Sequence, residues 1–254
     1  MATIDLTEFS TSDDFALTTE LPYAQWLNPQ KEVYGLAIKK DQAEIANFQP
    51  DENWQLKTVE FDSGNVEFWV TTTPRMIVLN PTEQISSTIK GNAKPLMMKH
   101  SSNEGASKGS AFYNDRIYKG AESGQWRAYR PLLFILVDKN NNFISNPIVL
   151  NAQKLSHNTL VQEQLPLWVN DVFNLFKELG GKVPAGQKPT CSFLSHFVFE
   201  PLFDKKYLQS TKGKGKSEGW VCVGYKKPTA ETWGEFAISR KSEQSQTIIA
   251  YGIN

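Results

Sequence analysis

The clearest hydrophobic pattern lies in the middle of the chain, within residues 131–180. Residues 131–137 (PLLFILV) are an unbroken apolar run bounded by charge, which is typical of a strand buried on both faces. A polar turn follows at 138–142 (DKNNN), and its asparagines tolerate the left-handed conformation. Residues 143–150 (FISNPIVL) return as a second strand, in which Pro147 indicates an edge or a bulge. This stretch predicts a strand hairpin.

One long helix is predicted directly after this hairpin, near residues 165–179. Apolar residues recur there at steps of three and four and form one broad stripe: Leu165, Trp168, Val169, Val172, Phe173, Phe176 and Leu179. Pro166 suits the first helical turn. Gly180 suits the position just past the helix end, and Pro184 prevents continuation. The stripe indicates a helix that covers a sheet or closes the end of a barrel.

Short apolar segments elsewhere predict many strands. Residues 57–61 and 66–72 pair as a hairpin, because Gly64 supplies the turn conformation between them. Further strands are predicted at 33–38, 75–80, 190–199, 220–225, 233–238 and 247–251. Residues 21–30 favour an ordered loop, and residues 41–48 favour a short helix. The predicted fold class is therefore mainly β, as an OB-like barrel or a β-sandwich with one long helix.

The composition is that of a soluble globular protein. The chain has 254 residues, of which 40% are hydrophobic and 21% charged. No apolar run of about 18 residues predicts a membrane span, and the N-terminus has no features of a secretory signal. Two cysteines, Cys191 and Cys222, fit a reducing compartment. We expect a cytoplasmic protein with no membrane partner.

The formal net charge is zero, but the two parts of the chain differ. Residues 1–66 hold 12 acids and four bases, a net −8, so the remainder carries +8. Residues 1–20, with five acids and no base, predict a mobile acidic tail. Residues 21–254 predict one compact β-rich domain, or two packed β-barrels joined near 125–185. The asymmetry favours self-association of an acidic front with a basic rear, unless the charges mix on the folded surface.

The sequence offers no catalytic motif. The run KGKGKSEG at 212–219 lacks the spacing of a phosphate-binding loop, and no Gly-x-Ser-x-Gly elbow occurs. Cys191 and His196 would face opposite sides of a regular strand, so together with Cys222 they predict neither a metal site nor a nucleophile. Paired acids such as Asp51–Glu52 stand in turns, where solvation or helix capping is the default role. We predict no catalytic residue, no metal and no cofactor.

Two segments combine aromatic residues with bases, the pattern that single-stranded nucleic acid requires. Residues 108–130 form the first, and residues 201–227, with seven lysines against Asp204 and Glu218, form the second. Cations neutralise phosphates while rings stack on unpaired bases. The candidate phosphate contacts are Arg116, Lys119, Arg127, Arg130, Lys212, Lys214 and Lys216, and the candidate stacking rings are Tyr113, Tyr118, Trp126 and Trp220. The alternative is that these rings belong to the core and the lysine-glycine loop is a solvated hairpin tip.

Residues 21–38 (LPYAQWLNPQKEVYGLAI), together with Trp54 and the FDSG at 61–64, resemble uncharacterised proteins of cyanobacteria and their plasmids. The resemblance covers the whole chain, but it implies no established activity and carries over no functional residue. Three hypotheses stay open. The first is a protein that binds single-stranded DNA or RNA without sequence specificity. The second is a β-sandwich assembly protein, and the third is a metal-dependent hydrolase or nuclease.

Overall fold

A computed structural model describes residues 21–30, 33–61, 64–81, 85–89, 98–100, 126–152, 157–209 and 216–251. The predicted acidic tail at 1–20 lies outside these residues. No helix in the described part of the chain combines the length and the apolar character needed to cross a membrane.

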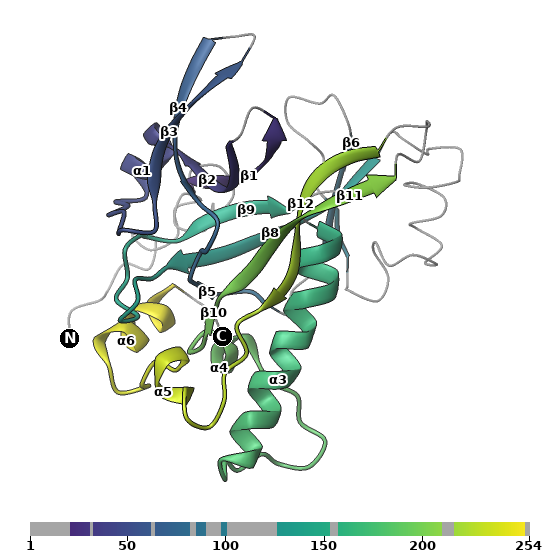
Figure 1. Cartoon of the computed structure of the whole chain (residues 1–254). Helices are drawn as coiled ribbons and strands as arrows, with labels where there is room; N and C mark the ends of the chain where they lie inside the picture. The colour runs from purple at the N-terminus through teal and green to yellow at the C-terminus, as the bar shows by residue number, and fades with distance from the viewer. Residues whose placement is uncertain are drawn as a thin grey trace, which may run out of the picture.

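Ten of the described strands form one mixed sheet (Figure 1). They are β1 (Tyr23–Gln30), β2 (Val33–Lys39), β3 (Gln55–Phe61), β4 (Gly64–Thr71), β5 (Met76–Val78), β6 (Ile85–Ile89), β7 (Met98–His100), β8 (Trp126–Leu136), β9 (Ile148–Ala152) and β10 (Val198–Phe199). The main path runs β10-β5-β8-β9-β1-β2-β4-β3, and β6 joins β8 to β7. Only the pairing of β1 with β9 is parallel among the described strands.

The prediction of a mainly β fold is confirmed, whereas a closed barrel is not found. The described sheet is open, because its path begins at β10 and ends at β3 and these two strands do not pair with each other. One core cluster nevertheless includes residues from Ala24 in β1 to Cys222 near the C-terminus. The sheet and its apolar cover therefore join both halves of the described chain.

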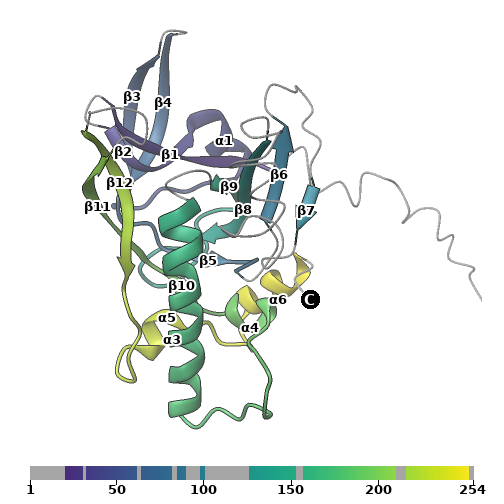
Figure 2. The same ribbon diagram turned by 90° about the vertical axis from the view of Figure 1, so that its right-hand side faces the viewer.

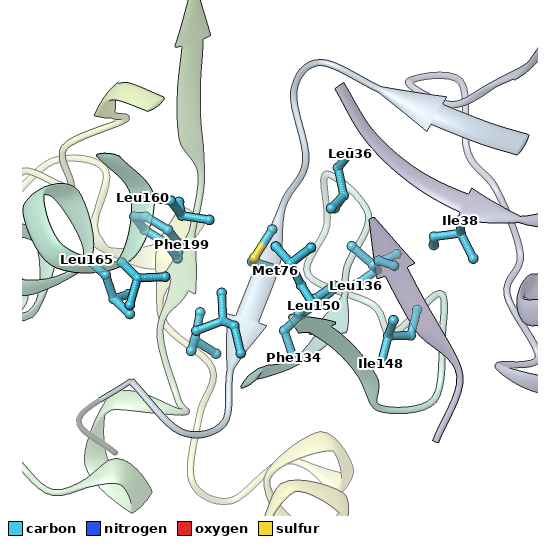
Figure 3. Packing of buried hydrophobic residues seen from close by; sticks show 14 of the residues in the cluster. Leu36, Ile38, Met76, Phe134, Leu136, Ile148, Leu150, Leu160, Leu165 and Phe199 are labelled. Carbon is cyan, nitrogen blue, oxygen red and sulfur yellow. The ribbon is translucent and has the colours of Figure 1, made fainter. Parts of the chain in front are cut away.

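The predicted central hairpin is confirmed as β8 and β9, which pair from Arg130–Ala152 to Phe134–Ile148. Its first strand is buried on both faces, because successive side chains point to opposite sides of a sheet. Phe134 and Leu136 belong to the large cluster that Figure 3 shows from close by. Ile135 and Val137 belong to a second cluster on the opposite face. This double burial explains the unbroken apolar run in the sequence.

The predicted long helix is confirmed as α3 (Leu165–Glu178), which continues a π-helical segment, η3 (His157–Gln164). Its buried residues, Leu165, Trp168, Val172 and Leu175, fall at steps of three and four. Gly180 adopts a φ of +87°, which suits the left-handed end of a helix. There Gly180 N donates to Lys177 O at 3.0 Å and Gly181 N to Phe176 O at 2.9 Å. Together with η3, α3 covers one face of the sheet (Figure 2).

Three predicted elements near the C-terminus are wrong in part or in whole. Residues 190–199 begin as a helix, α4 (Cys191–Leu194), and only Val198–Phe199 form a strand. Residues 233–238 begin as the helix α5 (Trp233–Phe236), and residues 247–251 belong to the helix α6 (Glu243–Ala250) and its end. Short apolar runs do not by themselves distinguish helices from strands. Phe236 and Ile248 from these helices cover the second cluster, on the face of β5 and β8 opposite α3.

Residues 21–30, predicted as a loop, form β1 instead. β1 pairs antiparallel with β2 and parallel with β9, where Tyr23 lies opposite Val149. The short helix predicted at 41–48 is confirmed as α1 (Lys40–Ile45), and the hairpin predicted at 57–72 is confirmed as β3 and β4. The strands predicted at 33–38 and 75–80 correspond to β2 and β5.

The remaining two described strands form a separate antiparallel ribbon, β11 (Pro201–Gln209) and β12 (Lys216–Tyr225). β12 includes the strand predicted at 220–225 and confirms it. β11 occupies the first part of the basic and aromatic segment at 201–227, where no strand was predicted. The lower end of the ribbon is tied to α3, because Tyr225 Oη donates to Asp171 Oδ2 at 2.6 Å. The ribbon then runs past the sheet toward β1 and β2 (Figures 1 and 2).

Candidate nucleic-acid interface

Two aromatic contacts join the ribbon β11–β12 to the strands β1 and β2. The rings of Trp26 and Phe203 lie 3.9 Å apart between centroids. The rings of Tyr34 and Trp220 are stacked, with centroids 4.1 Å apart and planes inclined by 14°. The pairing of Lys205 with Trp220 places both residues on one face of the ribbon. This face of the ribbon therefore packs against side chains of β1 and β2.

A lysine lies beside this aromatic stack. Lys205 Nζ is 5.3 Å from the ring centroid of Tyr34, within the range of a cation–π interaction. Lys205 and its neighbour Lys206 are both exposed, and neither forms an ion pair shorter than 4.0 Å with a described carboxylate. The ribbon thus holds one cation against an aromatic ring and a second cation next to it, on the other face.

A groove of about 260 Å³ opens beside Tyr34. Tyr34, Lys57, Asn53 and Gln55 are among the residues that line it, and they come from β2, β3 and the segment before β3. Lys57 supplies a cation, and the two amide side chains supply both donors and acceptors. The volume lies just below the roughly 300–1,000 Å³ of pockets for drug-sized ligands, so it suits one small planar group.

The local path of β2 shapes one wall of this groove. At Gly35 the φ angle is +127°, and a Cβ atom there would lie 2.2 Å from the carbonyl oxygen of Thr71. Only a glycine allows β2 and β4 to approach so closely in this conformation. Thr71 and Thr72 continue from this point into the lining of the groove.

A comparison with known protein families identifies the family of this chain. A family model described as a domain of unknown function, DUF5895, matches residues 18–251. The chain belongs to the DUF5895 family. The resemblance to uncharacterised proteins, seen in the sequence, is thereby confirmed. No curated protein and no solved structure matches the chain.

None of the predicted binding residues of this DUF5895 protein is among the described residues that line the groove. Tyr113, Arg116, Tyr118, Lys119, Lys212 and Lys214 lie outside the described residues. The backbones of Trp126, Arg127 and Arg130 belong to β8, where Trp126 pairs with Ile89 and Arg130 with Ala152. Lys216 begins β12 opposite Gln209. Lys216 is therefore on the same ribbon as Lys205, while the three β8 residues are on the main sheet.

Trp220 has a different place from the one predicted for it. Its side chain is 9% exposed, and one face of its ring packs on Tyr34. A base could stack on Trp220 only after displacing Tyr34. In the DUF5895 fold Trp220 instead supports Tyr34, which itself lines the groove.

The sequence prediction missed Tyr34, Lys57 and Lys205 as a group. Tyr34 stood inside a predicted strand, and Lys57 stood inside a predicted hairpin. Lys205 belonged to the lysine-rich segment but had no assigned partner. More than 140 residues separate Lys57 from Lys205 in the sequence, and only the folded arrangement of the ribbon and the sheet brings both beside Tyr34.

The cysteines and His196 have separate surroundings in the described part of the chain. Cys191 is in α4, whereas Cys222 is buried in β12. No group of three or more histidine, cysteine or acidic side chains in the described part of the chain has the arrangement of a metal site. Both ring nitrogens of His196 are occupied, Nδ1 by Ser192 O and Nε2 by Ser245 Oγ, each at 2.7 Å.

The contact of His196 with Ser245 has the donor and acceptor order of a serine nucleophile and its base. A carbonyl oxygen can only accept, so Nδ1 donates to Ser192 and Nε2 of the neutral ring accepts from the Ser245 hydroxyl. The Ser245 side chain is, however, fully buried. Because a nucleophile must reach its substrate, this pair serves the packing of α6 against α4.

Proposed function

We propose that this DUF5895 protein binds single-stranded nucleic acid, without sequence specificity, along the ribbon β11–β12 and the groove beside Tyr34. The observation that carries the proposal is the position of Lys205, 5.3 Å from a tyrosine ring that also lines a polar groove. An unpaired nucleotide requires a cation for its phosphate and an aromatic face for its base, and these two groups lie side by side here.

Each part of this site has a separate role in the proposal. Lys205 and Lys57 neutralise phosphates, and the groove accepts one base beside Tyr34. Asn53 and Gln55 carry both donors and acceptors, so they can satisfy the polar edge of any base. This tolerance agrees with binding that does not depend on sequence. A stacked base contributes about 1–3 kcal/mol.

Three more of the predicted lysines extend the same surface in the proposal. Lys212 and Lys214 follow β11 in the sequence, and Lys216 begins β12. They would continue the track of lysines toward the end of the ribbon. Binding of this kind breaks no bond and needs no cofactor. It also does not require the OB-like barrel, since a ribbon and an open sheet can form the groove.

The competing proposal, an assembly protein, has weaker support. One edge strand of the main sheet is β3, and it carries Lys57 and Glu60 among mostly exposed residues. Charged residues on an edge strand disfavour pairing with another chain. Static light scattering distinguishes the two proposals, because an assembly protein grows in mass with concentration while a nucleic-acid-binding monomer does not.

A salt titration tests the proposal. Fluorescence anisotropy of a labelled oligothymidylate should show binding at about 50 mM salt, with log K falling by about 0.7 per phosphate contact for each unit of log salt. The variant Lys205→Gln should weaken binding and reduce this slope by about 0.7. Lys188→Gln changes an exposed lysine in the segment between α3 and α4, outside the ribbon and the groove lining, and is the matched control.

Two results would overturn the proposal. One is the absence of binding at about 50 mM salt by the folded protein. The other is an equal loss of affinity in the ribbon variant and in Lys188→Gln, since the cations would then act without regard to position.

A further inference from the structure

A second cavity lies on a different part of the molecule, between the end of α3, α4 and the segment after α5. Its volume is about 350 Å³, within the range of small-molecule pockets. Residues from the ribbon and from the groove beside Tyr34 do not line it. Any ligand of this cavity is therefore independent of the proposed nucleic-acid interface.

Four aromatic rings form a continuous wall of this cavity. The centroids of Phe176 and Phe193 are 5.0 Å apart, those of Phe193 and Phe197 are 5.0 Å apart, and those of Phe197 and Trp233 are 4.9 Å apart. All three contacts are tilted or edge-on, the geometries that aromatic rings prefer. A flat aromatic guest would meet the same favourable arrangements.

The wall is held in place by its surroundings. A Cβ atom at Gly181 would lie 2.3 Å from the ring of Phe176, so that ring packs directly on the backbone that ends α3. Phe197 is buried, and its backbone bridges to Ala237, which also lines the cavity. The cavity is thus preformed, which reduces the entropy lost on binding.

The polar groups of the cavity favour an anion. His196 offers no further donor or acceptor on its ring nitrogens, because Ser192 and Ser245 occupy both. Arg240 also lines the cavity and is exposed, and no described carboxylate forms an ion pair with it. A guanidinium presents a planar fork of donors that matches a carboxylate with two parallel hydrogen bonds.

We infer that this cavity binds a small aromatic carboxylate, with its ring against Phe193, Phe197 and Trp233 and its carboxylate on Arg240. An apolar guest alone would leave the guanidinium hydrated and without a role in binding, and a large anion would exceed the volume. A compact aromatic acid satisfies both the wall and the cation.

Titration calorimetry with 2-naphthoate tests the inference, and 2-naphthalenemethanol serves as the neutral analogue. The wild-type protein should bind the acid more tightly than the alcohol. Arg240→Gln should weaken binding of the acid by about two- to fivefold and leave the alcohol unaffected, because an exposed ion pair is lost. Lys241→Gln, which removes the neighbouring cation outside the cavity, should leave both affinities unchanged.

A blocking variant completes the test without disturbing the core. Ser239 lines the cavity and is exposed, so Ser239→Trp should fill the entrance and remove binding of both ligands while thermal unfolding stays cooperative. The same variant should still bind oligothymidylate if that proposal holds. The inference is overturned if the folded wild type binds no naphthoate, if acid and alcohol bind equally, or if Lys241→Gln has the effect of Arg240→Gln.

Discussion

Arg75 Nη1 donates to Glu200 Oε2 across 2.6 Å, and the two side chains are only 11% and 16% exposed. The same guanidinium donates through Nη2 to Asn141 Oδ1 at 2.8 Å and to the backbone oxygen of Glu235 at 3.1 Å. One arginine therefore links the start of β5, the turn between β8 and β9, the start of β11 and the helix α5.

Replacement of Arg75 by alanine should lower the free energy of unfolding by about 3 kcal/mol, because it leaves the carboxylate of Glu200 partly buried without its main partner. The free energy of unfolding of Arg75→Lys should lie between those of the wild type and of Arg75→Ala, since one ammonium cannot reproduce the fork of donors. Urea unfolding measures both. Lys39→Ala breaks only an exposed contact with Asp41 and should leave the unfolding midpoint nearly unchanged. Equal midpoints for Arg75→Ala and Lys39→Ala would contradict the prediction.

His196 should make the protein less stable in mild acid. Burial lowers the pKa of His196 below its ordinary value of 6.5, and the positive charge of Arg240 lowers it further. The unfolded chain then binds a proton at about pH 6.5 that the folded chain takes up only at lower pH. The stabilisation is therefore complete above pH 6.5 and is lost as the pH falls toward the lowered folded value, by at most about 1.4 kcal/mol per pH unit.

Chemical unfolding of the wild type and of His196→Gln across this pH range isolates the effect. The difference between their free energies of unfolding should shrink with acidification. A difference that stays constant between about pH 7 and pH 5 would contradict the lowered pKa of His196 in the folded protein.

Cys222 should be unreactive while the protein is folded. Burial raises the pKa of its thiol to about 12, and the thiol donates to the Gly224 oxygen at 3.3 Å. Thiol reagents attack the thiolate, which is then almost absent near neutral pH. In the variant Cys191→Ser, Ellman's reagent should therefore detect no thiol until denaturant is added. Rapid colour formation in buffer would show that β12 opens readily.

Gly35 should tolerate no side chain. Gly35→Ala would require a positive φ of an alanine and would bring its Cβ within 2.2 Å of the Thr71 oxygen, so β2 and β4 must separate. We expect a loss of about 2 kcal/mol or more in unfolding free energy. Gly224→Ala is the control within a strand, since no heavy atom would lie within 4 Å of its new Cβ. Similar thermal unfolding temperatures of the two variants would contradict the close approach of Gly35 to Thr71.

Local patterns predicted the elements whose signals are contained in one stretch of chain. The hairpin β8–β9, the helix α3 and its glycine end, and the hairpin β3–β4 follow from periodicity, turn residues and capping. The predicted strand at 190–199 failed although a local signal was present: Thr190 Oγ1 accepts from Phe193 N at 3.1 Å and starts α4. Ser242 starts α6 in the same way, through Ser245 N at 3.2 Å. Helix-capping residues before short apolar runs were the evidence that the strand predictions overlooked.

The sequence by itself determined which segments are apolar on one face or on two, and hence the long helix and the doubly buried strand. Only the tertiary structure decided that residues 21–30 form a strand, because β1 gains its parallel partner β9 from more than 100 residues away. The groove beside Tyr34 and the second cavity likewise arise only in the tertiary structure. Lys205 meets Tyr34, and Arg240 joins the phenylalanine wall, through contacts between distant segments. Such contacts depend on how whole elements pack, and no local pattern of residues encodes them.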